Sequence, residues 1–181
     1  MQPGQPSPMG RYPSAPSQVE ALLAHVDVAG GVLDACGASS DAVSTVLGAH
    51  DLRVTTNDLN TQFKCDTHLD AGSEAFRLAF TVESVRPDWI VTSPPYSKAF
   101  SILVQAVRVA RVGVAFKLRL TFLEPTKTRG KWLKENPPSA VVVLPRAIYR
   151  GRKCNSAEAW FVWQTSSPEN APRKQAFFFS A

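Results

Sequence analysis

Short apolar runs alternate with amphipathic segments along most of the chain. Runs of four to seven residues, rich in β-branched and aromatic side chains, predict strands over 32–35, 52–57, 89–92, 114–120, 140–144 and 159–163. Apolar side chains at helical spacing predict helices over 18–28, 39–47, 72–85 and 100–111, with one helical turn over 131–134. Strands that alternate with helices predict an α/β fold with an open, mostly parallel sheet and helices on both faces.

The two ends of the chain differ in composition from the middle. Residues 1–17 contain five prolines and almost no apolar side chain to bury, which predicts a disordered tail. Residues 18–165 are expected to form one domain, because 181 residues with 44% hydrophobic side chains suit a single core. Residues 166–181 are expected to be a C-terminal tail, in which Phe177 to Phe179 either dock on the domain or pair as an edge strand.

Nothing in the sequence predicts a membrane helix, a disulfide framework or a metal site. The longest apolar runs, such as 140–144, are far shorter than the ~20 residues that a membrane helix needs, and the N-terminus lacks an apolar signal core. The cysteines, Cys36, Cys65 and Cys154, lie far apart without a C-x-x-C pair, and the histidines show no metal-binding spacing. We therefore expect an intracellular protein, in the cytoplasm or nucleus, in a reducing compartment.

The net charge of +5 is unevenly distributed along the chain. Residues 1–96 contain 5 Lys and Arg against 11 Asp and Glu, residues 97–153 contain 13 against 2, and residues 154–181 contain 2 against 2. The middle of the chain is therefore strongly basic, which favours a polyanionic partner for that part of the surface.

Two predicted strands end in residues that suit a small ligand. In the turn after the first strand, Gly37 lets the backbone approach a ligand closely, and Asp34 can accept a hydrogen bond from it. Cys36 in the same turn is interpreted as a small buried residue that closes the strand. Asp58 follows the second strand, 21 residues beyond Gly37, where dinucleotide-binding folds place an acid on ribose hydroxyls. These residues also occur as plain caps and turn formers, and the chain has no G-x-G-x-x-G or G-x-x-x-x-G-K-[ST].

The segment Ser93-Pro94-Pro95-Tyr96 comes directly after the predicted strand 89–92. Two prolines fix φ and remove two backbone donors, so the Ser93 and Pro94 carbonyls and the Ser93 hydroxyl are expected to point outward as acceptors beside the Tyr96 ring. Acceptors beside an aromatic face suit a flat ring that carries an amino group. A surface turn or a proline-rich ligand is the alternative, which the position after a buried strand disfavours.

This tetrapeptide resembles motif IV, [DNS]-P-P-[YFW], of the S-adenosylmethionine-dependent amino-methyltransferases that modify adenine N6 or cytosine N4. Residues 33–40 resemble motif I, although the usual D-x-F-x-G-x-G is here D-A-C-G-A-S-S, with one glycine. Asn57-Asp58 resembles the ribose-binding acid of motif II, and His68-Leu69-Asp70-Ala71 resembles the acid of motif III. Residues 89–163 are similar to the small adenine methyltransferases of phages and mobile elements.

The resemblance implies a single Rossmann-like class I methyltransferase domain with a mostly parallel seven-stranded sheet, and S-adenosylmethionine as cofactor. It implies that the cofactor is bound by Asp34, Cys36, Gly37, Asp58, Leu59 and Asp70. It implies that the catalytic residues are Ser93, Pro94, Pro95 and Tyr96. The target amine would donate to the Ser93 side chain and the Pro94 carbonyl, while Tyr96 stacks on the base. C5 methylation of cytosine is excluded, because the chain has no Pro-Cys dipeptide of that kind.

The resemblance leaves the substrate open. Adenine N6 in DNA is the first expectation, because the wider similarity points to adenine, whereas serine at the first motif position is commoner among cytosine-N4 enzymes. An RNA or protein-glutamine substrate is a further alternative, and the basic segment argues against the protein. The last alternative is that the protein is a catalytically inactive subunit of the same fold that binds nucleic acid.

Basic residues that follow the motif are the expected nucleic-acid contacts, because loops there can face the same edge of the sheet. They are Lys98, Lys127, Arg129, Lys131, Arg150, Arg152 and Lys153. A charged loop that only serves solubility is the alternative. Since only residues 124–139 and 145–158 are free to read a base sequence, we expect weak sequence selectivity, or recognition supplied by a fused or partner protein.

Overall fold

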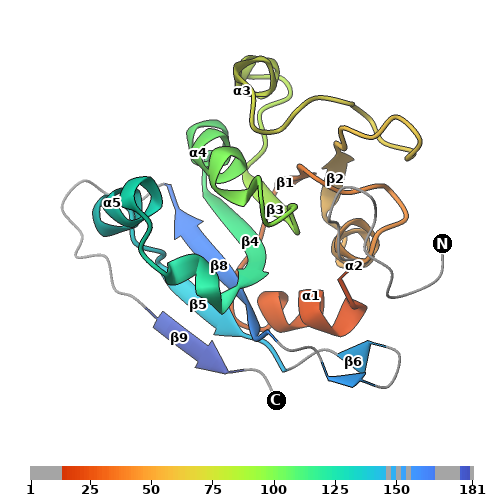
Figure 1. Ribbon diagram of the computed structural model, residues 1–181. Helices are drawn as coiled ribbons and strands as arrows, with labels where there is room; N and C mark the ends of the chain where they lie inside the picture. The colour runs from red at the N-terminus through yellow and green to blue at the C-terminus, as the bar shows by residue number, and fades with distance from the viewer. Residues whose placement is uncertain (1–13, 146–147, 150–151, 154–155, 166–175, 180–181) are drawn as a thin grey trace.

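A seven-stranded sheet forms the centre of the protein (Figure 1). The computed structural model describes residues 14–145, 148–149, 152–153, 156–165 and 176–179. The strand order is β2-β1-β3-β4-β8-β5-β9. These strands are β1 (Gly31–Asp34), β2 (Arg53–Thr56), β3 (Trp89–Thr92), β4 (Gly113–Arg119), β5 (Ala140–Val143), β8 (Glu158–Gln164) and β9 (Ala176–Phe179). Strand β8 runs antiparallel to both β4 and β5, and the other pairs are parallel, which confirms the expected mostly parallel α/β sheet.

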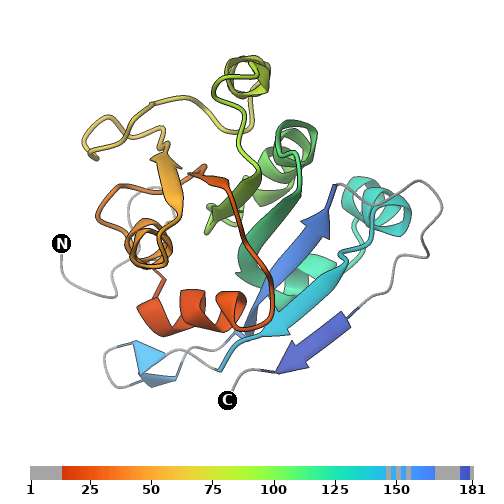
Figure 2. The ribbon, with the colours of Figure 1, turned by 180° about the vertical axis from the view of Figure 1, so that it is seen from behind.

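Helices cover both faces of the sheet, as the alternation of elements predicted (Figures 1 and 2). Those described are α1 (Pro16–Leu23), α2 (Ala42–Ala49), α3 (Glu74–Thr81), α4 (Ala99–Val109) and α5 (Lys127–Glu135), with the 3-10 helix η1 (Leu120–Leu123) after β4. Helices α1 and α2 pack on one face, and α3, α4 and α5 on the other. Strands β6 (Ile148–Tyr149) and β7 (Arg152–Lys153) pair with each other in a two-stranded antiparallel sheet.

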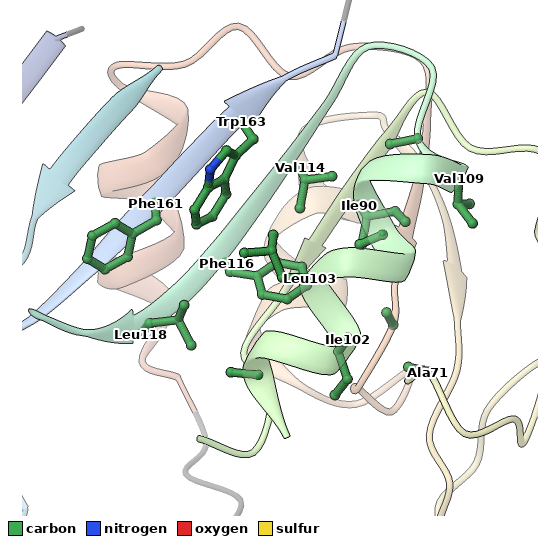
Figure 3. Packing of buried hydrophobic residues seen from close by; sticks show 14 of the residues in the cluster. Ala71, Ile90, Ile102, Leu103, Val109, Val114, Phe116, Leu118, Phe161 and Trp163 are labelled. Carbon is green, nitrogen blue, oxygen red and sulfur yellow. The ribbon is translucent and has the colours of Figure 1, made fainter. Parts of the chain in front are cut away.

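Each face of the sheet has its own apolar cluster, because successive side chains of a strand point to opposite faces. In β3, Ile90 faces α4 and contributes to the cluster around Leu103, whereas Val91 faces α1 and α2. Figure 3 shows the α4 side, where Ile102 and Leu103 point toward the sheet residues. Burial on both faces explains why these strands are continuous apolar runs rather than alternating ones.

Several helix boundaries differ from the sequence expectation for local reasons. Helix α1 begins at Pro16 rather than at residue 18, because proline at the first helical positions loses no intrahelical hydrogen bond. Helix α2 begins at Ala42 rather than at residue 39, and Asp41 lies just before it with its carboxylate 2.7 Å from the Ala38 N–H that donates to it. Helix α3 is shorter than 72–85 and begins after Ser73, whose hydroxyl accepts from the Phe76 N–H.

Helix α5 corrects the expected single turn over 131–134. It spans Lys127–Glu135, and its aromatic residue Trp132 packs edge-on against Phe100 of α4 with ring centroids 5.9 Å apart. The segment is polar in sequence and contains Gly130, so its helical pattern is weak. Packing of Trp132 and Leu133 against the α4-side cluster stabilises a helix that local propensity alone does not indicate.

The Phe-rich C-terminal segment pairs as an edge strand, one of the two possibilities left open. Strand β9 runs parallel to β5. Phe178 packs against the α1 side of the sheet and stacks on His25 with ring centroids 4.6 Å apart. Phe177 and Phe179 point the other way and are 59% and 77% exposed.

Candidate functional site

A cavity of about 300 Å³ opens beyond the carboxyl ends of β1, β2 and β3. It is formed by the turn after β1, the loop between β2 and α3, the segment after β3 and the start of α4. Its lining residues include Cys36, Asp58, Leu59, Asp70, Pro95 and Lys98. This edge of an open α/β sheet is where such folds bind ligands, so the cavity is the candidate site.

The turn after β1 is shaped by the buried carboxylate of Asp34, which is 1% exposed. Asp34 Oδ1 accepts hydrogen bonds from the Thr92 hydroxyl at 2.7 Å and from the Cys36 N–H at 3.3 Å. Asp34 does not line the cavity, which differs from the expectation that it faces the ligand, because its oxygen atoms are directed at groups of the protein. It holds the turn in shape beneath the cavity.

Gly37 lies beside this carboxylate and is not among the lining residues either. A Cβ atom at position 37 would lie 1.8 Å from Asp34 Oδ2, so any side chain there would displace the carboxylate. The Gly37 N–H donates to the Asn57 carbonyl at 3.0 Å. The glycine of the degenerate motif is therefore required by the close approach of Asp34 to the backbone.

The loop after β2 is organised by Asn57, a residue whose own role the sequence analysis missed. Asn57 is fully buried, and its Nδ2 donates to the carbonyls of Ala35 at 2.9 Å and Leu69 at 3.0 Å. Its Oδ1 accepts from the Leu69 N–H at 2.9 Å and from the Thr67 hydroxyl at 2.8 Å. Asn57 lies at the start of the loop after β2, and its side chain links the turn after β1, at Ala35, to the far part of that loop, at Thr67 and Leu69. The only signal in the sequence is an asparagine at the end of a strand.

Two carboxylates of this loop lie on the cavity wall. Asp58 is 7% exposed and its Oδ1 accepts from the Asn60 N–H at 2.8 Å. Asp70 Oδ1 accepts from the Gly72 N–H at 2.9 Å. Leu59, 54% exposed, lies on the wall beside them, and Cys36 contributes from the turn after β1. The wall therefore combines acidic acceptors with apolar surface.

Of the Ser93-Pro94-Pro95-Tyr96 segment, Pro95 is among the lining residues of the cavity, whereas Ser93, Pro94 and Tyr96 are not. Pro95 lines the cavity together with Ser97 and Lys98. Pro94 is buried and Ser93 is half-buried. The Lys98 N–H donates to the Pro95 carbonyl at 2.9 Å, so the segment leads directly into α4. The structure therefore brings Pro95 of the expected catalytic segment and four of the six expected cofactor residues to one cavity.

Tyr96 is half-buried and is held at two points. Its hydroxyl donates to the carboxylate of Glu158 on β8. The guanidinium of Arg119, at the end of β4, lies over the ring, 4.4 Å from its centroid. Burial raises the pKa of the Tyr96 phenol above its ordinary value, the hydrogen bond and negative charge of Glu158 raise it further, and Arg119 opposes the shift.

The expected basic contacts fall into three groups. Lys98 lines the cavity, and Lys127 and Lys131 are exposed on α5, one helical turn apart. Arg129 is half-buried instead: it donates to the Glu124 carbonyl at 2.7 Å and lies 5.0 Å from the centroid of the Phe122 ring. Arg152 and Lys153 form β7, and Arg150 lies outside the described residues, so their side-chain contacts stay predictions.

Membrane-spanning helices and metal-binding clusters are both absent from the described residues. No helix among them has the length and apolar composition needed to cross a membrane. In the same part of the chain, no group of three or more His, Cys, Asp or Glu side chains is arranged to hold a metal ion.

Solved structures with a similar fold include S-adenosylmethionine-dependent methyltransferases. The chain is similar to a Listeria monocytogenes protein described as a class I methyltransferase of this kind, with a TM-score of 0.60 and 12% identity over 91% of this chain and 62% of that one. It is similar to a protein described as a modification subunit of a type I restriction enzyme from Vibrio vulnificus, with a TM-score of 0.61 and 13% identity over 91% and 49%. A third is a Thermotoga maritima S-adenosylmethionine-dependent O-methyltransferase, with a TM-score of 0.54 and 14% identity over 88% and 69%.

These likenesses establish the fold as that of Rossmann-like methyltransferases. The chain spans 62% of the Listeria protein and 49% of the Vibrio protein. No protein-family model matches the sequence. No curated protein matches it either.

Proposed function

We propose that the protein is an S-adenosylmethionine-dependent methyltransferase that acts on the exocyclic amino group of a base in DNA, adenine N6 in the first place. One observation carries the proposal: Pro95 of the Ser93-Pro94-Pro95-Tyr96 segment and the acidic loop after β2 line the same cavity in a methyltransferase fold. A methyl donor held by the loop would therefore lie next to a target amine held by the segment.

The side chains that line the cavity suit S-adenosylmethionine. Asp58 and Asp70 supply carboxylate acceptors for hydroxyl groups and an electrostatic preference for a cation, while Phe63, Leu69 and Ile102 supply apolar surface for a flat ring. When bound, S-adenosylmethionine supplies an electrophilic methyl group on a positively charged sulfur. The turn held by Asp34 and Gly37 gives the backbone of Cys36 a fixed position at the cavity wall.

The segment after β3 would bind and orient the target amine. An exocyclic amine conjugated with a base ring is a weak nucleophile, because its lone pair is delocalised into the ring. Hydrogen bonds from the amine to the Ser93 hydroxyl and the Pro94 carbonyl favour a more pyramidal nitrogen and direct its lone pair into the cavity. The Tyr96 ring would stack on the base, which has left its duplex or comes from a single strand, and would help to exclude water.

DNA is the proposed polymer because cations follow the motif along the chain, one of them at the cavity. Lys98 lies at the cavity, and the exposed Lys127 and Lys131 of α5 follow the strand next to β3. Lysines at such positions suit phosphate groups. The similarity to a modification subunit of a restriction enzyme adds support for DNA and for a partner protein that supplies sequence recognition.

Cytosine N4 in DNA is the second candidate, and one residue favours it. Ser93 occupies the first motif position, where cytosine-N4 enzymes more often have serine and adenine enzymes more often have Asp or Asn. The wider similarity of residues 89–163 to small adenine methyltransferases favours adenine. Both candidates use the same cavity and the same acceptors.

The test is incubation of the purified chain with methyl-labelled S-adenosylmethionine and unmethylated DNA or RNA, followed by mass spectrometry of the nucleosides. We expect labelled N6-methyladenine from DNA. Labelled N4-methylcytosine would select the second candidate, and label only in RNA would replace the DNA substrate. Calorimetry with S-adenosylmethionine is the companion measurement. No binding at about millimolar cofactor, the weak end of specific affinity, would refute the enzyme for this chain alone and favour an inactive nucleic-acid-binding subunit.

A further inference from the structure

Three buried polar side chains from distant parts of the chain contact one another, and one of them is bonded to Tyr96. Gln18 of α1, Lys117 of β4 and Glu158 of β8 are 6%, 0% and 5% exposed. Lys117 Nζ donates to Gln18 Oε1 at 3.1 Å and lies 3.7 Å from Glu158 Oε2. Gln18 Nε2 donates to the same Glu158 oxygen at 3.5 Å. We call Gln18, Lys117 and Glu158 the buried triad.

Stability alone does not explain the buried triad. Removal of a carboxylate and an ammonium from water costs several kcal/mol per ion, and apolar residues of similar volume often stabilise a protein as well or better. The surrounding surface of the sheet is apolar, with Trp160 and Val142 on the same face. Charged residues in such surroundings indicate a role other than fold stability, namely to hold a neighbouring group in a fixed geometry.

Glu158 connects the buried triad to the proposed target site. Its Oε2 atom faces Lys117 and Gln18, while its Oε1 atom accepts the hydroxyl hydrogen of Tyr96. One carboxylate therefore spans the distance between a fully buried ammonium and the half-buried ring. The opposite residue in the β4–β8 ladder is Arg119, the same residue that covers one face of the Tyr96 ring.

We propose that Glu158, itself fixed by Lys117 and Gln18, is a positioning residue that locks the Tyr96 ring in the orientation needed to stack on the target base. The proposal rests on the proposed function, since it assigns Tyr96 a base to stack on. Glu158 does not touch the substrate and acts through the Tyr96 hydroxyl.

A locked ring improves binding for a physical reason. A free aromatic side chain must be ordered when a base stacks on it, and the ordering opposes binding; a ring fixed in advance avoids this cost. Arg119 already covers one face, so a base can stack only on the other face or in place of the guanidinium. The hydrogen bond from the Tyr96 hydroxyl to Glu158 is the contact through which strand β8 would set the plane of the ring.

The experiment compares Glu158→Gln, Tyr96→Phe and the double variant. A single-stranded oligonucleotide with one 2-aminopurine in place of the target adenine reports stacking through fluorescence quenching, and methylation assays report KM and kcat. We expect each single variant to weaken oligonucleotide binding by about five- to tenfold, at the lower end of what base–aromatic stacking contributes. Because Glu158 acts only through the hydroxyl, the double variant should bind no more weakly than Tyr96→Phe alone.

Two controls separate positioning from folding. Ser139→Ala removes a hydroxyl that donates to the Val162 carbonyl of β8 at 3.0 Å, away from Tyr96, and should leave quenching unchanged. Lys117→Met combined with Glu158→Gln removes both buried charges; it should melt near the wild-type temperature and still show the quenching defect. In Glu158→Gln, tyrosinate absorbance should also appear at lower pH than in the wild type, a readout that needs no substrate.

The outcomes distinguish the two proposals. Wild-type quenching in Glu158→Gln, or additive losses in the double variant, would overturn the positioning role even if the wild type methylates DNA. A quenching defect of equal size in Ser139→Ala would also overturn it. If the wild type neither methylates nor quenches 2-aminopurine, the proposed function fails, whereas the shift in tyrosinate absorbance would still follow from the contact with Glu158.

Discussion

The loops after β2 and after β3 both line one cavity, but they are held in different ways. The loop after β2 is fixed mainly from within: Asn57 bonds to Thr67 and Leu69, at most 12 residues away, as well as to Ala35. The segment after β3 depends on Tyr96, whose partner Glu158 is 62 residues away. In the proposed function, the loop after β2 is the cofactor wall and the segment after β3 is the target wall. The cofactor wall is thus largely a local structure, whereas the target wall is complete only when β8 has joined the sheet.

This difference predicts that substitutions can impair cofactor binding and target binding separately. Local changes near β1 and β2 should reduce cofactor affinity and leave the target wall intact. Changes in the segment after β3, or in distant residues that hold it, should reduce turnover or base binding and spare the cofactor.

The largest effect is expected from Ser93→Ala and Pro94→Ala, which alter only the target wall. Ser93→Ala removes one acceptor for the target amine, and Pro94→Ala keeps the carbonyl but loses the ring that fixes φ and so directs it. Each should lower kcat by about 10²-fold or more, because such hydrogen bonds act mainly in the transition state. Cofactor affinity measured by calorimetry should stay unchanged. Ser101→Ala is the matched control, since its hydroxyl donates to the Lys98 carbonyl on α4 and takes no part in the proposed chemistry. Wild-type turnover in Ser93→Ala would refute the site.

Gly37→Ala should produce the converse result at the cofactor wall. The new Cβ atom would lie 1.8 Å from Asp34 Oδ2, so the carboxylate must move and the turn at Cys36 must change shape. Overpacking of this size costs roughly 1–3 kcal/mol, which corresponds to about a 5- to 150-fold loss of cofactor affinity if it falls on the bound turn. Calorimetry measures the affinity, and quenching of a 2-aminopurine oligonucleotide should persist.

Gly48→Ala is the matched control for this substitution. A Cβ atom at position 48 meets nothing within 4 Å, and the residue lies in helix α2. Alanine should therefore be neutral there or stabilise the helix by about 0.5–1 kcal/mol. Equal cofactor affinities in Gly37→Ala and Gly48→Ala would contradict the role given to the close approach of Asp34.

The sequence predicted the local wall better than the distant one. Strand β3 has its expected bounds because a short apolar run ends at two prolines, and the positions of Asp58 and Asp70 follow from their places after β2. The contact between Tyr96 and Glu158 depends on the register of β4 and β8, in which Arg119 lies opposite Glu158. No local pattern encodes that register, so neither Glu158 nor Lys117 could be predicted from the sequence as part of the proposed site.

Helix α5 shows the same limit in the proposed DNA-binding region. The sequence predicted that Lys127, Arg129 and Lys131 act together as cations. The helix separates them, because Arg129 packs toward Phe122 while both lysines are exposed. The two lysines are therefore better candidates for phosphate contacts than the arginine.

A smaller effect should follow from Lys131→Ala. Loss of one phosphate contact should weaken DNA binding several-fold and reduce the slope of log K against log salt by about 0.9. Lys64→Ala, which removes one exposed charge from the cofactor-side loop, is the control and should change neither quantity. Binding titrations over a range of salt concentrations measure both. Identical slopes in the two variants would show that α5 does not face the DNA.

The smallest effect is expected on the free energy of unfolding at alkaline pH, which tests the hydrogen bond from Tyr96 to Glu158. The pKa of Tyr96 is raised in the folded protein, first by burial and then by Glu158, above the value of about 10 for an exposed tyrosine. The unfolded chain therefore loses this proton first, so the stabilisation is complete below pH 10 and declines as the pH rises above it. The slope is at most about 1.4 kcal/mol per pH unit, and less here because Tyr96 is partly exposed. Urea unfolding at several pH values above 9 should show a steeper loss of stability in the wild type than in Tyr96→Phe. Parallel curves would mean that Glu158 does not hold the protonated phenol, and the target wall would then lack the long-range anchor that separates it from the cofactor wall.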